Sequence, residues 1–177
     1  PKNYKSYKGE VGKIAPNLLD RDFFASKPNE KWVTDVTEFS LFDQKLYLSP
    51  ILDLYSGDIV SYTIYEHPYL IMVTEMLGKA FEKIPDNANL ILHSDQGWHY
   101  QHKQYQKRLM DKGIQQSMSR KGNCLDNSIM ENFFGLLKSE LLYLREFESI
   151  DEFIVELEKY IAYYNNNRIK AKLKGLS

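Results

Sequence analysis

One face of a predicted helix in the C-terminal half of the chain carries side chains that suit metal and phosphate chemistry. Within residues 117–144, Asn127, Glu131, Gly135 and Lys138 follow one another at spacings of four, four and three residues. Helical geometry places residues at these spacings in one line along a single face. That line offers an amide, a carboxylate, a gap without a side chain and an ammonium group, so it is a candidate site for a metal ion or a phosphate.

A purely structural role for Glu131 stays open beside this functional one. The sequence from Ser128 to Glu131 matches the S-x-x-E capping box, in which the glutamate only caps the start of a helix. However, Leu125 already fits the apolar stripe of the helix, and Asn123 or Asp126 could cap an earlier start. Both interpretations predict a helix that contains Glu131.

Two further carboxylates occupy positions that call for an explanation. Asp35 lies inside Trp32–Phe39, a run of aromatic and β-branched residues that predicts a strand, and aspartate is disfavoured within strands. Asp35 could instead end a strand or cap a turn, although Val36 and Thr37 continue the β pattern beyond it. Asp95 follows Leu90–Leu92, a short apolar run typical of a strand buried on both faces. Ligands bind at the carboxyl ends of such strands. Carboxylates from separate elements suit Mg²⁺, which prefers oxygen ligands, and a pair of such ions supports in-line phosphoryl transfer.

The elements that must position these residues indicate an α/β fold. Three strands joined by short turns predict an antiparallel meander, and a helix leading into the apolar strand before Asp95 predicts a crossover connection. The expected strands are 32–39, 46–54, 59–65, 90–92 and 114–118. The expected helices are 68–83, 100–112, the helix that carries Glu131, and a last helix that begins at Ser149 and ends near residue 165.

The overall composition is that of an ordinary globular domain. The chain has 177 residues, 43% hydrophobic residues and a formal net charge of −1, which fits one domain and excludes a uniformly basic nucleic-acid coat. No apolar run approaches the roughly 18 residues of a membrane span, and the N-terminus lacks the apolar core of a secretory signal. Cys124 is the single cysteine. These features predict a cytoplasmic protein without a membrane segment.

Charge is segregated along the chain. Residues 101–121 contain six basic residues and one acidic residue, and residues 165–177 contain four basic residues and no acidic one. Local basic patches suit contacts with a phosphate backbone, although a single charged run is more often a solvated surface. The candidates for contacts with nucleic acid are Lys138, Arg120, Lys121, Asn127 and Arg168.

A zinc site is the less favoured interpretation of the metal-binding residue types. His99, His102 and Cys124 would supply three ligands. Their spacing fits no common structural-zinc pattern, and a second cysteine is absent from the sequence. The sequence also lacks a G-x-S-x-G motif that would predict a serine nucleophile.

Four motifs, in order along the chain, resemble those of a known family. They are WVTDVTEF at 32–39, HSDQG at 93–97, SMSRKGNCLDNSIMENFF at 117–134 and YNNNR at 164–168. With them, the chain resembles the catalytic domain of bacterial insertion-sequence transposases of the IS-three group (OrfB type), relatives of the retroviral integrases. The 35 residues between Asp95 and Glu131, and Lys138 seven residues after that glutamate, match the pattern of this family.

The resemblance implies an RNase H-like α/β fold, a mixed five-stranded sheet of three antiparallel strands plus two parallel ones, with helices on both faces. It implies Asp35, Asp95 and Glu131 as the catalytic residues and as ligands of two Mg²⁺ or Mn²⁺ ions per active site. The implied reaction is cleavage of DNA by water, followed by strand transfer, in which a 3′-hydroxyl attacks a phosphodiester. The implied partners are double-stranded DNA, both the insertion-sequence ends and the target, and further copies of the chain in a homo-oligomer.

We expect residues 1–30 to be an arm or linker, residues 31–165 to be the catalytic core, and residues 166–177 to be a basic tail. Two other functions compete with transposition. One is a stand-alone RNase H-like nuclease, which would prefer an RNA–DNA hybrid to DNA ends. The other is a non-catalytic DNA-binding module, against which the intact set of three carboxylates argues.

Overall fold

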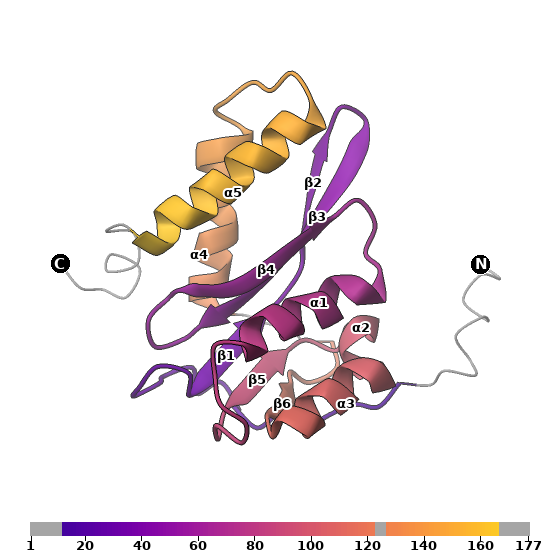
Figure 1. Cartoon of the computed structure of the whole chain (residues 1–177), viewed down its shortest axis with the longest axis vertical. Coiled ribbons are helices and arrows are strands. Elements are labelled where there is room, and N and C mark those ends of the chain that lie inside the picture. Colours follow the sequence, from indigo (N-terminus) through magenta and orange to yellow (C-terminus); the bar gives the residue numbers. More distant parts are fainter. Residues whose placement is uncertain (1–11, 123–126, 167–177) are drawn as a thin grey trace.

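A mixed β-sheet forms the centre of the molecule (Figure 1), which is a computed structural model that describes residues 12–122 and 127–166. Strand β3 pairs antiparallel with β1 and β2 along one side and with β4 along the other, while β5 is parallel to β1 and β6 is parallel to β5. The strands are β1 (Lys31–Thr34), β2 (Thr37–Leu41), β3 (Gln44–Asp53), β4 (Ile59–Tyr65), β5 (Ile91–Ser94) and β6 (Gln115–Met118). The expected sheet of three antiparallel and two parallel strands is confirmed, with β1 and β2 as two parts of the first strand.

The expected continuous strand over residues 32–39 is interrupted beside Asp35, so that prediction was wrong in detail. Strand β1 ends at Thr34 and β2 begins three residues later, which leaves Asp35 and Val36 outside both strands. The register of the flanking pairs places this interruption opposite Pro50, which has no N–H to donate to a neighbouring strand. The carbonyl of Pro50 instead accepts a hydrogen bond from the Thr34 hydroxyl at 2.8 Å. Asp35 therefore stands at the end of a strand rather than in its interior.

Helices pack on the sheet in the order that the sequence predicts. They are α1 (Leu70–Phe81), α2 (Trp98–Gln101), α3 (Lys103–Lys112), α4 (Ser128–Leu136), the π-helical turn η2 (Leu137–Leu142) and α5 (Ile150–Asn166). The single helix expected over 100–112 is divided at His102, because the side chain of His102 caps α3 by accepting from the backbone N–H of Gln104. Within the described parts of the chain, no helix has the length and apolar composition needed to cross a membrane.

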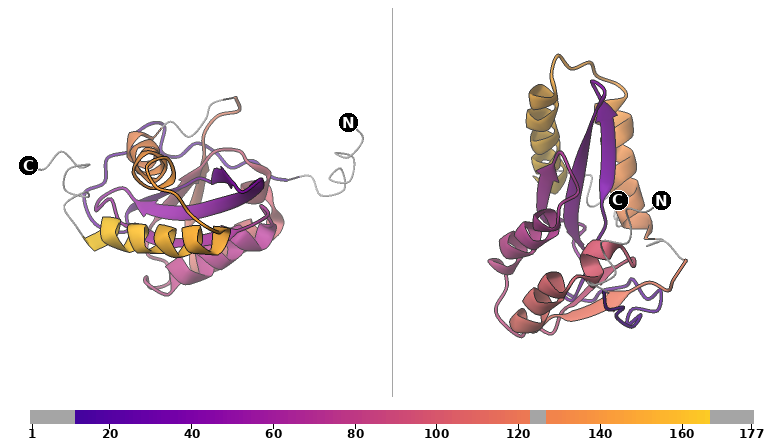
Figure 2. Two further views of the ribbon diagram at one scale, coloured as in Figure 1. Left: turned by 90° about the horizontal axis from the view of Figure 1, so that it is seen from above. Right: turned by 90° about the vertical axis from the view of Figure 1, so that its right-hand side faces the viewer.

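Two clusters of buried side chains hold these helices to the sheet. One cluster joins α4, η2 and α5 to β2 and β3, and it includes edge-to-face ring contacts of Phe39 with Phe153 at 5.2 Å and of Phe133 with Tyr164 at 4.8 Å. The other cluster joins α1 and α3 to the sheet around Trp32. Figure 1 shows α1, α2 and α3 together at one end of the molecule and α4 and α5 at the other. In the right-hand view of Figure 2 the β2–β3 hairpin runs between α4 and α5. Helices of both clusters therefore cover the sheet, and their packing fixes the positions of the strand ends.

Residues 12–30 form neither helix nor strand, but they contact the core. Leu19 is 3% exposed and Ala25 is 6% exposed, and both belong to the cluster that contains α4 and α5. The described part of the expected arm or linker therefore packs on the domain.

Two glycines should respond in opposite ways to replacement by alanine. Gly113 ends α3 with a left-handed φ of 82°, and an added Cβ would lie 2.1 Å from Oδ1 of Asn87. Gly135 lies in α4 with no atom within 4 Å of an added Cβ. We expect Gly113→Ala to lower the free energy of unfolding by more than about 1 kcal/mol and Gly135→Ala to raise it by about 0.5–1 kcal/mol, as measured by urea denaturation. Equal effects of the two substitutions would contradict these local geometries.

Candidate active site

Asp35 and Asp95 occupy equivalent positions at the ends of two adjacent parallel strands. Strands β1 and β5 are paired so that Trp32 lies beside Leu92 and Val33 lies beside His93. The same register, continued two residues further, brings Asp35 next to Asp95. Both side chains therefore leave the sheet at its carboxyl edge, which is where the crevice of an open α/β sheet binds ligands.

The Asp35 carboxyl is partly buried among other acidic groups. Burial raises the pKa of Asp35 to about 6, and the negative charges of Asp95 and Glu131 push the pKa in the same direction. The backbone N–H of Val36, which donates to Asp35 Oδ1 at 2.8 Å, opposes this rise. Asp95 and Glu131 are thus both within electrostatic reach of Asp35, and the ionised form of Asp35 is destabilised by its surroundings.

The loop after β5 fixes the Asp95 side chain. Oδ1 of Asp95 accepts a hydrogen bond from the backbone N–H of Gly97 at 2.8 Å. An added Cβ on Gly97 would lie 3.1 Å from that same oxygen, which is a tight contact. The Gln96 side chain donates to the carbonyl of Ser119 at 3.1 Å and so ties this loop to the one that follows β6. The carboxylate is therefore held by the backbone that surrounds it.

Glu131 reaches the site from the first turns of α4. The helix begins after Asn127, whose side chain accepts from the backbone N–H of Met130 at 2.9 Å and forms the N-cap. In a capping box the glutamate stands three residues after the N-cap. Because the N-cap is Asn127, Glu131 lies one residue beyond that position. A capping box that pairs Ser128 with Glu131 is therefore excluded. The Glu131 side chain is exposed, while Met130 and Phe133 on the opposite face are buried.

The three carboxylates are neighbours, but they are not yet arranged as a closed set of metal ligands. Among residues 12–122 and 127–166, no group of three or more His, Cys, Asp or Glu side chains is arranged to hold a metal ion. The electrostatic effect of Asp95 and Glu131 on Asp35 nevertheless requires proximity. Like-charged groups that share one edge of the sheet repel each other.

Three basic candidates for nucleic-acid contact lie within the described residues, two of them exposed and one partly exposed. Arg120 is exposed, and its guanidinium lies 3.5 Å from the exposed carboxylate of Asp20. Lys121 is exposed as well. Lys138 is only partly exposed, and its ammonium nitrogen lies 5.7 Å from the centre of the Phe39 ring. The Lys138 side chain therefore lies over the ring of Phe39 in β2. Its ammonium group also places a positive charge near α4.

The prediction that Asn127 lies on an exposed polar line with Glu131 was wrong. Asn127 is 2% exposed, and its side-chain oxygen serves the helix cap. The residue has an extended backbone conformation and stands outside the helix, so helical spacing does not apply to it. Arg168 lies outside the described residues.

The two histidines of the zinc interpretation have other contacts. His99 Nε2 lies 2.6 Å from the carbonyl oxygen of Pro68, and His102 caps α3. Cys124 lies outside the described residues. The structure therefore gives both histidines structural roles.

One polar pair beneath the site was not singled out by the sequence. His93 Nδ1 lies 2.7 Å from the Ser117 hydroxyl, and the two residues are partners in the β5–β6 pairing. Both are buried, and burial lowers the pKa of His93 to about 4. The available signal was a histidine directly after a buried apolar strand and two residues before Asp95, but only the pairing register shows which residue faces it.

Comparison with known proteins identifies the family. The integrase core domain family matches residues 25–124. The chain belongs to the integrase core domain family. A second family, also described as an integrase core domain, matches residues 131–177. The expected kinship with insertion-sequence transposases and retroviral integrases is confirmed by this match and by the relatives below.

Two similar proteins carry names that refer to transposases. The chain is 56% identical over 176 residues to the putative transposase InsK for insertion sequence element IS150 of Escherichia coli K12, covering 99% of this chain and 62% of that protein. It is 54% identical over 174 residues to an uncharacterized transposase-like protein of Haemophilus influenzae, covering 98% of this chain and 80% of that protein. The chain thus spans less than two thirds of the InsK relative.

The fold is shared with retroviral integrase cores. The structure of the HTLV-2 integrase catalytic core domain in complex with magnesium, in its trimeric form, superposes with a TM-score of 0.56 at 17% identity. The superposition covers 79% of this chain and 84% of that one. At this identity the match establishes the common RNase H-like fold.

The environment of Asp35 predicts how stability depends on pH without metal. Because the pKa of folded Asp35 is raised to about 6, its contribution to stability is fully present below its ordinary pKa and is lost as the pH rises through about 6. Asp35→Asn removes this titration. We expect the variant, in the presence of a chelator, to be more stable than the wild type by about 1–3 kcal/mol at pH 8 and nearly equal to it at pH 4.

Urea denaturation at a series of pH values measures the difference. Asp43→Asn, in the exposed turn before β3, is the matched control for removing a carboxylate away from the site. A stability difference between Asp35→Asn and the wild type that stays constant from pH 4 to pH 8 would contradict the assigned environment.

Proposed function

We propose that this chain is the catalytic core of a DNA transposase that cleaves DNA strands and joins them to a target. The observation that carries the proposal is the placement of Asp35 and Asp95 side by side at the carboxyl edge of β1 and β5, with Glu131 near enough to raise the pKa of Asp35. Membership of the integrase core domain family and the names of the relatives support it. The same names favour transposition over the alternatives of a ribonuclease or a non-catalytic module.

The three carboxylates fit a pair of divalent cations. Hard cations such as Mg²⁺ and Mn²⁺ take oxygen ligands, and all three proposed ligands are carboxylates. Burial is the main cause of the raised pKa of Asp35, and the negative charges of Asp95 and Glu131 add to it; bound cations would offset both effects. When bound, two such ions would activate the attacking oxygen and stabilise the leaving oxygen of an in-line displacement. The magnesium of the HTLV-2 structure is consistent with this choice of ion.

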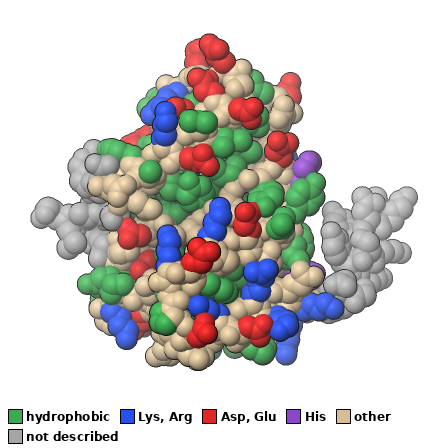
Figure 3. Space-filling view, viewed as in Figure 1, with side chains coloured by type: hydrophobic (Ala, Val, Ile, Leu, Met, Phe, Trp, Pro, Cys, Tyr) green, Lys and Arg blue, Asp and Glu red, His purple; other side chains and the backbone are tan. Residues whose placement is uncertain are grey.

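The protein groups then have separate tasks. Asp35 and Asp95 would define the fixed side of the site, because their backbones belong to adjacent strands and Gly97 holds one oxygen of Asp95. Glu131 would complete the ligand set from α4. Lys138, Arg120 and Lys121 would bind phosphates beside the scissile bond and so hold the DNA in register. In the face shown in Figure 3, basic side chains gather mainly over the half of the molecule that contains α1 to α3.

The proposed substrate is double-stranded DNA, both the ends of an insertion sequence and a target. The proposed assembly is a homo-oligomer, which the trimeric form named for the HTLV-2 integrase core supports. We further propose that residues 31–165 are the catalytic core and that residues 1–30 and 166–177 are its flanking segments. The chain spans 62% of the InsK relative, so these activities are proposed for the protein that contains the core.

The first prediction of this proposal concerns the carboxylates. Asp35→Asn, Asp95→Asn and Glu131→Gln should each reduce strand cleavage and strand transfer by at least about 10³-fold, because each removes a metal ligand. A double variant should lose little more than a single one, since the ligands act as a unit. Activity is measured on DNA with insertion-sequence ends, in Mg²⁺ or Mn²⁺, using the full-length protein. Asp43→Asn is the control, and any of the three variants that cleaved at the wild-type rate would refute the assignment of that residue.

The second prediction concerns the phosphate contacts. Lys138→Ala should weaken DNA binding and reduce the slope of log Kd against log salt concentration by about one unit, because one phosphate contact is lost. Lys159→Ala serves as the control, because Lys159 is exposed on α5 and pairs with Glu156. An unchanged salt slope for Lys138→Ala would mean that the ammonium group serves only its contact with Phe39.

A further inference from the structure

The segment of residues 12–19 is attached along α2, α3 and the outer edge of β6. At one end, the backbone N–H of Lys13 donates to the carbonyl of Gln101 at 3.1 Å, and the Gln106 side chain donates to the carbonyl of Lys13 at 2.7 Å. At the other end, the N–H of Met118 donates to the carbonyl of Pro16 at 3.1 Å. The segment thereby covers an edge of the sheet that would otherwise present unpaired backbone groups.

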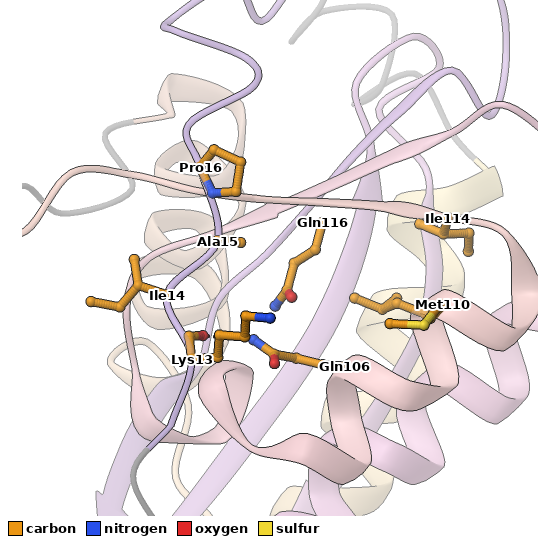
Figure 4. A pocket seen from close by; sticks show the side chains of 9 residues that line it. Lys13, Ile14, Ala15, Pro16, Gln106, Met110, Ile114 and Gln116 are labelled. Carbon is orange, nitrogen blue, oxygen red and sulfur yellow. The ribbon is translucent and has the colours of Figure 1, made fainter.

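Hydrogen bonds and the buried Leu19 side chain together hold this segment in place. Between its attached ends the segment crosses a pocket of about 270 Å³ against α3 and β6. Figure 4 shows Ile14, Ala15 and Pro16 on one side of this pocket, with the Gln106 and Gln116 side chains reaching toward them. Because the pocket leaves this stretch without close support, attachment of the segment depends on its hydrogen bonds and on the packing of Leu19.

Ser117 is the central anchor. Its hydroxyl oxygen accepts the backbone N–H of Leu18 at 2.8 Å and of Leu19 at 3.3 Å. A hydroxyl accepts two hydrogen bonds and donates one, so its only proton is available for His93 Nδ1 at 2.7 Å. Ser117 is 0% exposed, His93 is 2% exposed and Leu19 is 3% exposed, so water is not at hand to replace the hydroxyl at His93 Nδ1 or at the Leu19 N–H. Removing this hydroxyl would therefore leave these two buried polar groups without this bond and would also free the N–H of the more exposed Leu18.

The far end of this link reaches the proposed metal ligands. His93 belongs to β5 and lies two residues before Asp95, and it is the strand partner of Val33 in β1. The N–H of Ser119 donates to the carbonyl of Ser94 at 2.9 Å, which joins β6 to β5 immediately before Asp95. A shift of the 12–19 segment would thus be transmitted through one hydroxyl to the strand end that carries Asp95.

We propose that Ser117 is a positioning residue that couples attachment of the 12–19 segment to the placement of Asp95 for metal binding. This inference rests on the proposed function, because it concerns the same carboxylates. Through this coupling, attachment of the 12–19 segment would control metal affinity at the active site. Any binding partner that pulled the segment away from α3 and β6 would weaken metal binding. By reciprocity, metal binding must tighten attachment of the segment by the same factor.

Two substitutions test the coupling in the 177-residue chain. Ser117→Ala removes the hydroxyl. Gly12→Ala acts from the opposite end, because an added Cβ at Gly12 would lie 2.4 Å from Cβ of Gln101 and displace the segment far from the carboxylates. Ser61→Ala is the matched control, since Ser61 is also a buried serine on a strand, with its hydroxyl bonded to the carbonyl of Met76.

The measurements are Mn²⁺ affinity by calorimetry and amide hydrogen exchange at Leu18 and Leu19 with and without Mg²⁺. In the wild type and in Ser61→Ala, saturating Mg²⁺ should slow exchange at both amides. In Ser117→Ala we expect faster exchange, no response to Mg²⁺ and Mn²⁺ affinity weaker by at least about fivefold. Gly12→Ala should weaken Mn²⁺ binding in the same direction and add little to Ser117→Ala in the double variant.

A purely structural role would give a different result. If Ser117→Ala exchanges faster at Leu18 and Leu19 but binds Mn²⁺ within about twofold of Ser61→Ala, the coupling is refuted. If Ser117→Ala does not fold, Gly12→Ala decides by the same two measurements. If the wild type itself binds no Mn²⁺, the proposed function fails and the coupling fails with it, whereas Mn²⁺ binding that is indifferent to both substitutions overturns the coupling alone.

Discussion

The structure depends on one unfavourable interaction, the gathering of three carboxylates at the carboxyl edge of two parallel strands. Asp35 is partly buried there, and the charges of Asp95 and Glu131 add to the cost of ionising it. A protein gains no stability from this arrangement. Such a cost is tolerated where a function requires the groups to be close, and strongly shifted pKa values are for that reason concentrated at functional sites. The remainder of the fold can be understood as the framework that keeps these groups together in spite of their repulsion.

Asp35 and Asp95 are positioned by strand pairing, whereas Glu131 is positioned by the packing of a helix. Asp35 and Asp95 are fixed by the ladder between β1 and β5, because changing their separation would break strand pairing. Glu131 depends on the packing of α4, which the Asn127 cap and the burial of Met130 and Phe133 hold against the sheet. A helix can shift on its packing surface more easily than two paired strands can separate. This difference agrees with a ligand set in which strand pairing limits the separation of Asp35 and Asp95, whereas Glu131 has more freedom to move.

Sequence patterns predicted most of the elements and singled out Asp35, Asp95 and Glu131 as candidates, but they did not reveal the contacts between distant residues. The β-branched run around Asp35 and the apolar strand before Asp95 are local signals, and so is Gly113, which ends α3 as expected. The interruption of the first strand was missed because it depends on Pro50, a residue of a different strand. Asn127 was misplaced because helical spacing was extended over a residue that caps the helix.

The link from residues 12–19 to Asp95 was missed for the same reason. The anchoring bonds of Ser117 join residues nearly a hundred positions apart in the sequence. Composition marks the first thirty residues as an arm, with three prolines and several lysines, and does not reveal that part of this segment lies against the edge of β6. Only the pairing of β5 with β6 brings His93 to Ser117.

We propose that Asp35, Asp95 and Glu131 together hold divalent cations. Anomalous diffraction from crystals of the chain grown with Mn²⁺ tests this most directly, because it locates the ions without an assay of activity. We expect an anomalous peak between the Asp35 and Asp95 carboxylates, with oxygen distances of about 2.0–2.3 Å, and Glu131 turned toward it. Mn²⁺ peaks found only elsewhere on the protein, with the edge between β1 and β5 empty at saturating Mn²⁺, would contradict it.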